Sequence, residues 1–287
     1  MSNDGSRERR LAKLVEGTSR ARVLAELDDS RSLGRDCRLP DGERGRSPRR
    51  AAGHRRLRLA PSETIDWFSP PGPGPHPVLI YIHGGYWQEL SKSESAFMVM
   101  DLLREGIGVA VVDYQLAPAA RLEAIIDQCA AAANHILGLA ADLGADLGRM
   151  VVAGSSAGAH LAAMVLGQVD RLAGGVLLSG VYDLRPLVGT YVNDALGLDE
   201  SRAAAFSPLG RPMRSLTPLV VAVGENETSE FHRQTAEFAA DRRSVGHPVV
   251  ELRAAGRHHF DIPYDLGNAR SALGRQSLGL LRRGVLS

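Results

Sequence analysis

Short apolar runs alternate with stretches of helical periodicity from about residue 59 to the C-terminus. The runs predict strands over 64–68, 78–82, 108–114, 149–153, 176–179, 219–223 and 249–252. The periodic stretches predict helices over 122–139, 230–243 and 266–282, and an alanine-rich helix that begins near residue 159. Because most of these strands are apolar throughout rather than alternating, we expect both of their faces to be covered. The pattern therefore predicts an α/β fold with a mostly parallel central sheet and helices on both faces.

Residues 1–58 lack this pattern and differ in charge. They hold fifteen arginines and one lysine against nine acidic residues, with few aromatic or β-branched side chains. Such a composition favours a flexible or cap-like extension, with a partner-binding arm as the alternative. Within it, residues 11–27 carry enough Leu, Val and Ala for an amphipathic helix that lies over the mouth of a site. We therefore predict an N-terminal extension over 1–58 and one α/β domain over 59–287.

The composition of the whole chain excludes several function classes. A net charge of +1 over 287 residues gives no electrostatic footprint for nucleic acid. No apolar run approaches the length of a membrane span, and none follows the Arg9-Arg10 pair as an export signal requires. Cys37 and Cys129 are too few for a disulfide framework and lack metal-ligand spacing. We expect a cytoplasmic protein that acts on a small molecule, with no nucleic-acid or membrane partner; the sequence leaves a homodimer open.

One pentapeptide, Gly154-Ser155-Ser156-Ala157-Gly158, lies between a predicted strand and a predicted helix. This is the context of a nucleophile elbow, a sharp turn that projects a serine hydroxyl above the carboxyl end of a parallel sheet. The glycines of such an elbow give room where strand and helix come too close for a Cβ atom. The pattern predicts Ser156 as a nucleophile, provided that the chain also supplies its catalytic partners.

A serine nucleophile needs a base to remove its proton and an acid to orient that base. In this class of fold the acid and then the histidine follow the serine along the chain, each at the end of a strand. Glu227 comes shortly after the strand predicted over 219–223, and His259 after the strand predicted over 249–252. We therefore predict a triad of Ser156, Glu227 and His259.

Other residues compete for two of these roles. Glu225 lies two residues before Glu227, and Asp183 follows a predicted strand where some lipases place their acid. His258 is the neighbour of His259 and would point elsewhere. Residue order alone leaves these competing residues open.

The segment His83-Gly84-Gly85-Tyr86-Trp87 directly follows a predicted strand. It has the form of an esterase oxyanion loop, whose backbone N–H groups bind the negative charge of a tetrahedral intermediate. The predicted donors are the N–H groups of Gly85 and Tyr86, together with that of Ala157 after the nucleophile. The side chains of Tyr86 and Trp87 are candidates for stacking on a substrate. The alternative is that Trp87 packs beneath the loop as part of the core.

Six segments of the chain together carry a family resemblance. They are His83-Gly84-Gly85-Tyr86-Trp87, Asp113-Tyr114-Gln115-Leu116-Ala117-Pro118, Gly158-Ala159-His160-Leu161-Ala162, Gly180-Val181-Tyr182-Asp183-Leu184, Glu230-Phe231-His232-Arg233-Gln234 and His259-Phe260-Asp261. Their combination resembles the kynurenine formamidases (arylformamidases), in the hormone-sensitive-lipase branch of the α/β-hydrolases, over roughly residues 60–285. The resemblance implies the α/β-hydrolase fold and hydrolysis of N-formylkynurenine to formate and kynurenine, with no metal and no cofactor. It also matches His259 and Glu227 to the base and the acid, the acid being aspartate in most of that family.

We therefore expect a serine hydrolase that cleaves N-formylkynurenine, or a related N-formyl arylamine, through a formyl-enzyme. A carboxylesterase of the hormone-sensitive-lipase type, acting on short acyl esters, is the alternative among enzymes, and acyl-length preference distinguishes the two. A catalytically inactive binding protein with a hydrolase fold is the alternative from another class. The presence of a serine, an acid and a histidine in the required order argues against it.

Overall fold

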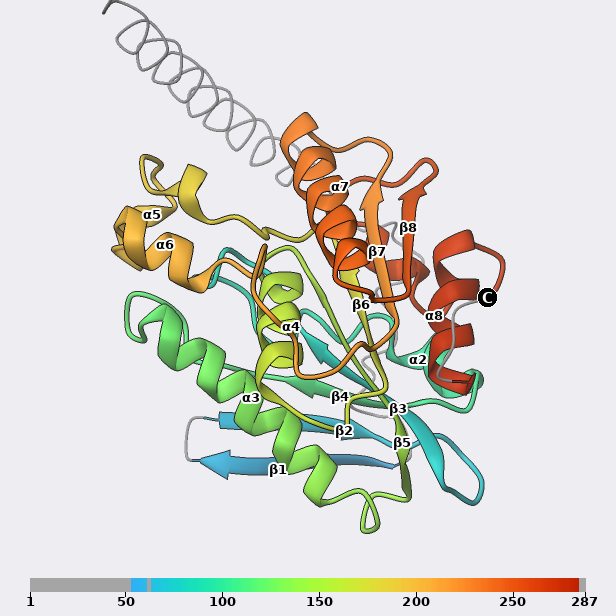
Figure 1. Ribbon diagram of the computed structural model, residues 1–287. Coiled ribbons are helices and arrows are strands. Elements are labelled where there is room, and N and C mark those ends of the chain that lie inside the picture. Colours follow the sequence, from blue (N-terminus) through green and yellow to red (C-terminus); the bar gives the residue numbers. More distant parts are fainter. Residues whose placement is uncertain (1–52, 61–62, 284–287) are drawn as a thin grey trace, which may run out of the picture.

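A computed structural model describes residues 53–60 and 63–283, so the predicted helix over 11–27 and most of the predicted extension lie outside the described residues. The described chain folds around an eight-stranded sheet (Figure 1). The strands are β1 (His54–Ala60), β2 (Glu63–Phe68), β3 (His76–Ile82), β4 (Gly108–Val112), β5 (Ala145–Ser155), β6 (Gly174–Leu178), β7 (Leu219–Gly224) and β8 (Val249–Ala254). The helices are α2 (Val99–Arg104), α3 (Leu122–Gly138), α4 (Ala157–Gln168), α5 (Asn193–Leu196), α6 (Glu200–Phe206), α7 (Ser229–Ser244) and α8 (Ala272–Arg283), with short 3₁₀ turns η2 (Arg185–Leu187) and η3 (Ile262–Asp265).

The strand order across the sheet is β1-β2-β4-β3-β5-β6-β7-β8. Strands β3 to β8 pair with one another in parallel, whereas β2 pairs antiparallel with both β1 and β4. This confirms the predicted mostly parallel sheet. Strand β1 was not predicted from the sequence; it pairs with β2 and crosses the boundary predicted at residue 58. In a parallel sheet the carboxyl ends of the strands meet at one edge, which is where such folds place their ligands. The predicted site residues all follow strands at this edge.

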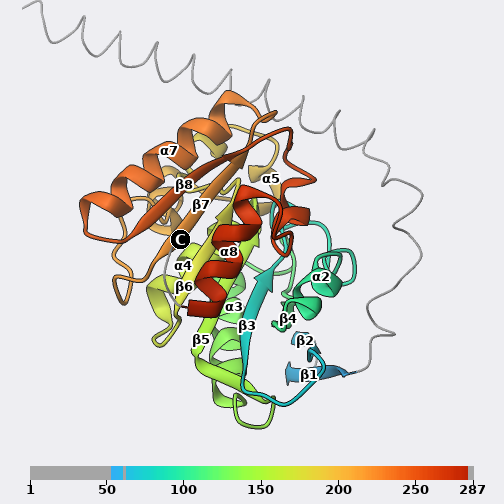
Figure 2. The same cartoon turned by 90° about the vertical axis from the view of Figure 1, so that its right-hand side faces the viewer.

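The two faces of the sheet carry separate layers of helices. Alternate residues of β3 point to opposite faces: Val78, Ile80 and Ile82 belong to the core beneath α3, α4 and α7. Leu79 and Tyr81 belong to the core beneath α2 and α8. Figure 2 shows α8 in front of the strands and α3 and α4 behind them. Both faces are thus covered, as the continuously apolar strands predict.

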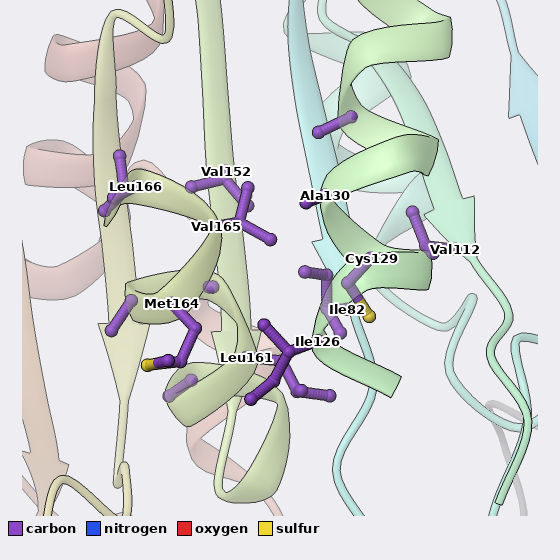
Figure 3. Close-up of a cluster of buried hydrophobic side chains, with 14 of the residues drawn as sticks. Ile82, Val112, Ile126, Cys129, Ala130, Val152, Leu161, Met164, Val165 and Leu166 are labelled. Atoms are coloured by element: carbon purple, nitrogen blue, oxygen red, sulfur yellow. The ribbon is translucent and has the colours of Figure 1, made fainter. Parts of the chain in front are cut away.

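Helices α3 and α4 cover the sheet next to the elbow. In α3, the buried positions Leu122, Ile125, Ile126 and Cys129 recur at helical spacing and form one apolar face. In α4, every residue over 157–166 is buried, so this helix is enclosed rather than amphipathic. Figure 3 shows side chains of both helices meeting residues of the central strands. No helix among residues 53–60 and 63–283 has the length and apolar character needed to cross a membrane.

The helix predicted over 266–282 begins later than expected, at Ala272. A Cβ atom on Gly267 would lie 2.9 Å from Cβ of Asp101, so the chain passes too close to α2 for a regular helical side chain there. The Ser271 hydroxyl then accepts the N–H of Gly274 at 2.9 Å, as a helix N-cap does. The close packing at Gly267 and the N-cap hydrogen bond of Ser271 therefore explain why α8 begins at Ala272.

Candidate active site

Ser156 lies in the turn between β5 and α4 with φ 58° and ψ −123°. A Cβ atom on Gly154 would lie 2.1 Å from the carbonyl oxygen of Gly158, and one on Gly158 would lie 2.1 Å from that of Ile82. Glycine is therefore required on both sides of the serine. A non-glycine residue held at positive φ by such tight packing is typical of a functional site. The local geometry is that of a nucleophile elbow.

The elbow is anchored to the neighbouring strand and opens α4. The backbone N–H of Ser156 donates to the carbonyl oxygen of Leu178, at the end of β6, at 2.8 Å. Ala157 is the first residue of α4, so its N–H has no acceptor within the helix. The partial positive charge at the start of a helix favours an anion at this position.

The predicted oxyanion loop, residues 83–87, packs against the elbow. A Cβ atom on Gly84 would lie 3.3 Å from Cβ of Ser156. Gly85 and Tyr86 follow with φ values of 96° and 49°, which turn the chain sharply away from β3. Residues 85 and 86, predicted from the sequence as oxyanion donors, therefore directly follow the residue that packs against the serine.

Glu227 and His259 are joined by a short hydrogen bond. Nδ1 of His259 donates to Oε2 of Glu227 at 2.7 Å, and the Glu227 side chain is fully buried. The other carboxylate oxygen accepts the Ser179 hydroxyl at 2.5 Å and the Gly224 N–H at 2.6 Å. Burial alone would raise the pKa of Glu227, but the charge of His259 and these hydrogen bonds outweigh it and lower the pKa below its ordinary value. The carboxylate is thus held ionised and oriented towards the imidazole.

The competing residues have other partners. Both Asp183 oxygens are bound by the Arg185 guanidinium, at 2.9 and 2.8 Å. Glu225 accepts the Gly256 N–H at 2.8 Å and so ties the ends of β7 and β8 together. Nδ1 of His258 accepts a backbone N–H two residues later, at 3.1 Å. Among the described residues, no three His, Cys, Asp or Glu side chains gather as metal ligands.

A largely buried ion pair braces the predicted oxyanion loop. Lys92 donates through Nζ to Oδ2 of Asp113 at 2.7 Å and to Oγ1 of Thr64 at 2.5 Å. Nε2 of His83 lies 3.7 Å from Oδ1 of Asp113, while its Nδ1 is bonded to the Gly84 carbonyl oxygen at 2.9 Å. Burial raises the pKa of Asp113, but His83 and Lys92 outweigh burial and bring it down to about 2. The first residue of the loop is therefore held against a fixed negative charge.

Trp87 is part of the core rather than of the site's surface. Its ring is fully buried, and Nε1 donates to Nδ1 of His160 on α4 at 3.2 Å. Nε2 of His160 then donates to the carbonyl oxygen of Phe206 at 2.8 Å. This arrangement favours the alternative that Trp87 packs beneath the loop, because a fully buried ring offers no face to a substrate. Tyr86, which is only partly buried, stays a candidate for that contact.

Four residues of the site received no role from the sequence pattern. Ser179 binds the carboxylate of the predicted acid, and Lys92 braces the oxyanion loop. Phe231 on α7 packs its ring 4.3 Å from that of His259, centroid to centroid. Phe260 also contacts His259, edge-on at 5.3 Å, and is nevertheless 42% exposed. Both phenylalanines lie in segments that carry the family resemblance, which was the only sequence signal for them.

Comparisons with known proteins agree in fold and in family. The BD-FAE family matches residues 65–173. A kynurenine formamidase of Danio rerio is 35% identical over 224 residues, which cover 71% of this chain and 72% of that protein. A kynurenine formamidase of Salmo salar is 32% identical over 283 residues, with 91% and 84% covered. A hyperthermophilic esterase from the archaeon Pyrobaculum calidifontis has the same fold, with a TM-score of 0.66 at 19% identity and coverage of 78% and 82%.

Proposed function

The chain belongs to the kynurenine formamidase family, and on that premise we propose that it hydrolyses N-formylkynurenine, or a related N-formyl arylamine, to formate and the free arylamine. Ser156 acts as the nucleophile, His259 as the base and Glu227 as the orienting acid. The enzyme works on this small molecule in the cytoplasm, the compartment expected from its composition.

The observation that supports this proposal most is the bond between His259 and Glu227. Because Nδ1 of His259 donates to the buried carboxylate at 2.7 Å, a neutral imidazole keeps its lone pair on Nε2. A lone pair on Nε2 is what a general base for a serine hydroxyl needs. The residue that would use this base, Ser156, is held at a strained elbow at the same edge of the sheet.

In the first half of the reaction, Ser156 Oγ attacks the formyl carbon while Nε2 of His259 takes its proton. The carbonyl oxygen becomes an oxyanion, which the N–H groups of Gly85, Tyr86 and Ala157 bind. A single preorganised donor of this kind contributes about 10²–10³ in rate. Glu227 stabilises the imidazolium that forms, without becoming protonated itself.

In the second half, the C–N bond breaks as His259 returns its proton to the aniline nitrogen. The free arylamine leaves, and a formyl ester on Ser156 remains. Water then attacks this ester with His259 again as base, which releases formate and restores the serine. Each proton removed is returned in the same turnover, so the cycle is balanced.

The surroundings of the base suit an aryl leaving group. The leaving nitrogen has to approach Nε2 of His259, so an aryl ring attached to that nitrogen lies close to the imidazole. Phe260 contacts His259 edge-on and is exposed enough to meet such a ring. Tyr86, on the oxyanion loop, supplies a second aromatic side chain.

The proposal is tested by a panel of substrates that differ in acyl length. Purified enzyme is given N-formylkynurenine, its N-acetyl analogue, and p-nitrophenyl formate, acetate and butyrate, and the released acids are quantified. We expect formate release from N-formylkynurenine that is abolished in Ser156→Ala, with a steep loss of rate from formyl to acetyl. Fast cleavage of acetyl and butyryl esters without formate release from N-formylkynurenine would instead identify a carboxylesterase. A Ser156→Ala variant with full activity would overturn the proposed nucleophile.

A further inference from the structure

We propose that Ser179 is a positioning residue, which fixes the Glu227 carboxylate so that it can orient His259; this rests on the triad of the proposed function. The Ser179 hydroxyl donates to Oε1 of Glu227 at 2.5 Å. Both side chains are fully buried, so the bond is shielded from solvent. Ser179 itself touches neither the nucleophile nor the base through any bond that the structure shows, so its effect passes through Glu227.

Ser179 lies where the elbow and the acid meet. It directly follows β6, whose last residue, Leu178, accepts the backbone N–H of Ser156 at 2.8 Å. Its own N–H donates to the carbonyl oxygen of Ala222 on β7 at 2.7 Å. The hydroxyl that holds the acid is therefore built on backbone shared with the nucleophile's turn. The segment Leu178-Ser179 therefore bonds both to the turn at Ser156 and to the carboxylate of Glu227.

A glutamate needs this anchor because its carboxylate turns about several side-chain torsions. The two oxygens of Glu227 have separate partners: Oε2 takes His259, and Oε1 takes Ser179 and the Gly224 N–H. Without the serine hydroxyl, the remaining hydrogen-bond partner of Oε1 is the Gly224 N–H, at 2.6 Å. A hydrogen bond to a charged group, if expressed fully in the transition state, corresponds to about tenfold to a hundredfold in rate. We expect a loss of this size in kcat.

The backbone of Ser179 provides a way to separate positioning from stability. Its φ is 49°, a left-handed conformation that glycine adopts readily and that a β-branched residue resists. Ser179→Gly therefore relieves backbone strain while it deletes the hydroxyl. Ser179→Thr keeps a hydroxyl and adds strain. If Ser179 positions the acid, the glycine variant loses mainly rate, whereas the threonine variant, which keeps the hydroxyl, loses mainly stability.

The experiment compares wild type, Ser179→Gly, Ser179→Thr and the control Ser277→Ala. Ser277 is an equally buried serine on α8, whose hydroxyl donates to the carbonyl oxygen of Leu273 and not to the site. Each protein is assayed for the rate of Ser156 labelling by a fluorophosphonate probe, kcat and KM for formate release, the thermal unfolding midpoint, and the downfield proton resonance of the Nδ1–H of His259.

In Ser179→Gly we expect labelling and kcat to fall about tenfold to a hundredfold with KM nearly unchanged. The Nδ1–H resonance should shift or broaden, while the unfolding midpoint falls only slightly, because relief of backbone strain offsets part of the lost buried hydrogen bond. In Ser179→Thr we expect a lower midpoint with most of the rate retained. Ser277→Ala should keep the wild-type rate and the wild-type resonance.

A Ser179→Gly variant with wild-type labelling rate and resonance would overturn the inference. So would a folded Ser179→Thr variant that loses as much rate as the glycine variant; if it does not fold, the glycine variant and its resonance decide. Failure of the proposed function gives a different result. In that case the wild-type enzyme is not labelled at Ser156, or releases no formate, whatever stands at position 179.

Discussion

Acid should destabilise this fold through one buried histidine, His160. Its Nδ1 accepts the indole N–H of Trp87, and its Nε2 donates to the carbonyl oxygen of Phe206, with the side chain fully buried. This pairing requires a neutral ring, because a proton on Nδ1 would face the indole N–H. Burial accordingly lowers the pKa of His160 from 6.5 to about 4.

The sign of the effect follows from that pKa. The folded-state pKa of His160 lies below the unfolded value, so its contribution to the free energy of unfolding is constant well above pH 6.5. That contribution is lost as the pH falls from 6.5 towards 4, because over this range the unfolded chain takes up the proton more readily than the folded protein does. Relative to about pH 7.5, the loss in unfolding free energy is about 2 kcal/mol at about pH 5 and about 3 kcal/mol at about pH 4. That is a large part of the total stability of an ordinary domain.

The measurement compares wild type with His160→Gln, whose amide can still donate to the Phe206 carbonyl but does not titrate. Urea unfolding is followed by tryptophan fluorescence at about pH 7.5 and about pH 5. The variant should be the less stable protein at the higher pH, and the difference should shrink by about 2 kcal/mol at the lower pH. Other titrating groups cancel because they are present in both proteins. An unchanged difference at the two pH values would refute the argument that a neutral, buried His160 holds the loop.

Three further substitutions follow from the site geometry. Glu227→Gln should lower kcat by about 10⁴ with the fold intact by circular dichroism, because an amide does not stabilise the imidazolium of His259; a loss below tenfold would contradict the assigned acid. Gly85→Ala should lower kcat for formate release by about 10²–10³, since a Cβ there would lie 2.2 Å from the carbonyl oxygen of Glu89 and the loop has to move; an unchanged kcat would place the oxyanion donors elsewhere. Phe260→Ala should raise KM for N-formylkynurenine several-fold but leave KM for ethyl formate unchanged, and an equal effect on both would exclude contact with the aryl ring.

The parts of the site that sequence could predict are those encoded locally. The elbow around Ser156 needs two glycines at fixed positions, because strand and helix touch there, and that requirement is visible as a five-residue pattern. The strand ends before Glu227 and His259 are equally local, since a buried parallel strand is a short apolar run. The strand–helix order therefore predicted the parallel sheet, and the ends of its strands predicted where these side chains gather.

The parts that sequence could not predict depend on contacts between distant segments. Ser179 binds a carboxylate 48 residues away, and Lys92 binds one 21 residues away. The residues that neighbour Ser179 and Lys92 in the sequence do not indicate which carboxylate each one binds. Lys92 is unusual only as the one lysine beyond residue 59 in an arginine-rich chain. The sequence likewise did not show whether the Trp87 side chain faces the substrate or the core, because its burial depends on a hydrogen bond to His160, which lies 73 residues later. A one-dimensional pattern carries no information on such pairings.

The two halves of the site are both tied to the elbow, by different routes. On one side, the turn at Ser156 is bonded to the end of β6, and the next residue, Ser179, binds Glu227, the proposed acid. On the other side, His160 lies one helical turn after Ser156 on α4 and accepts a hydrogen bond from Trp87, which belongs to the proposed oxyanion loop. A shift of α4 against β6 would therefore displace the acid and the loop relative to each other. The burial of residues 157–166 of α4 and of all of β6 opposes that shift, so dense packing around the elbow keeps the proposed donors, nucleophile and base in one geometry.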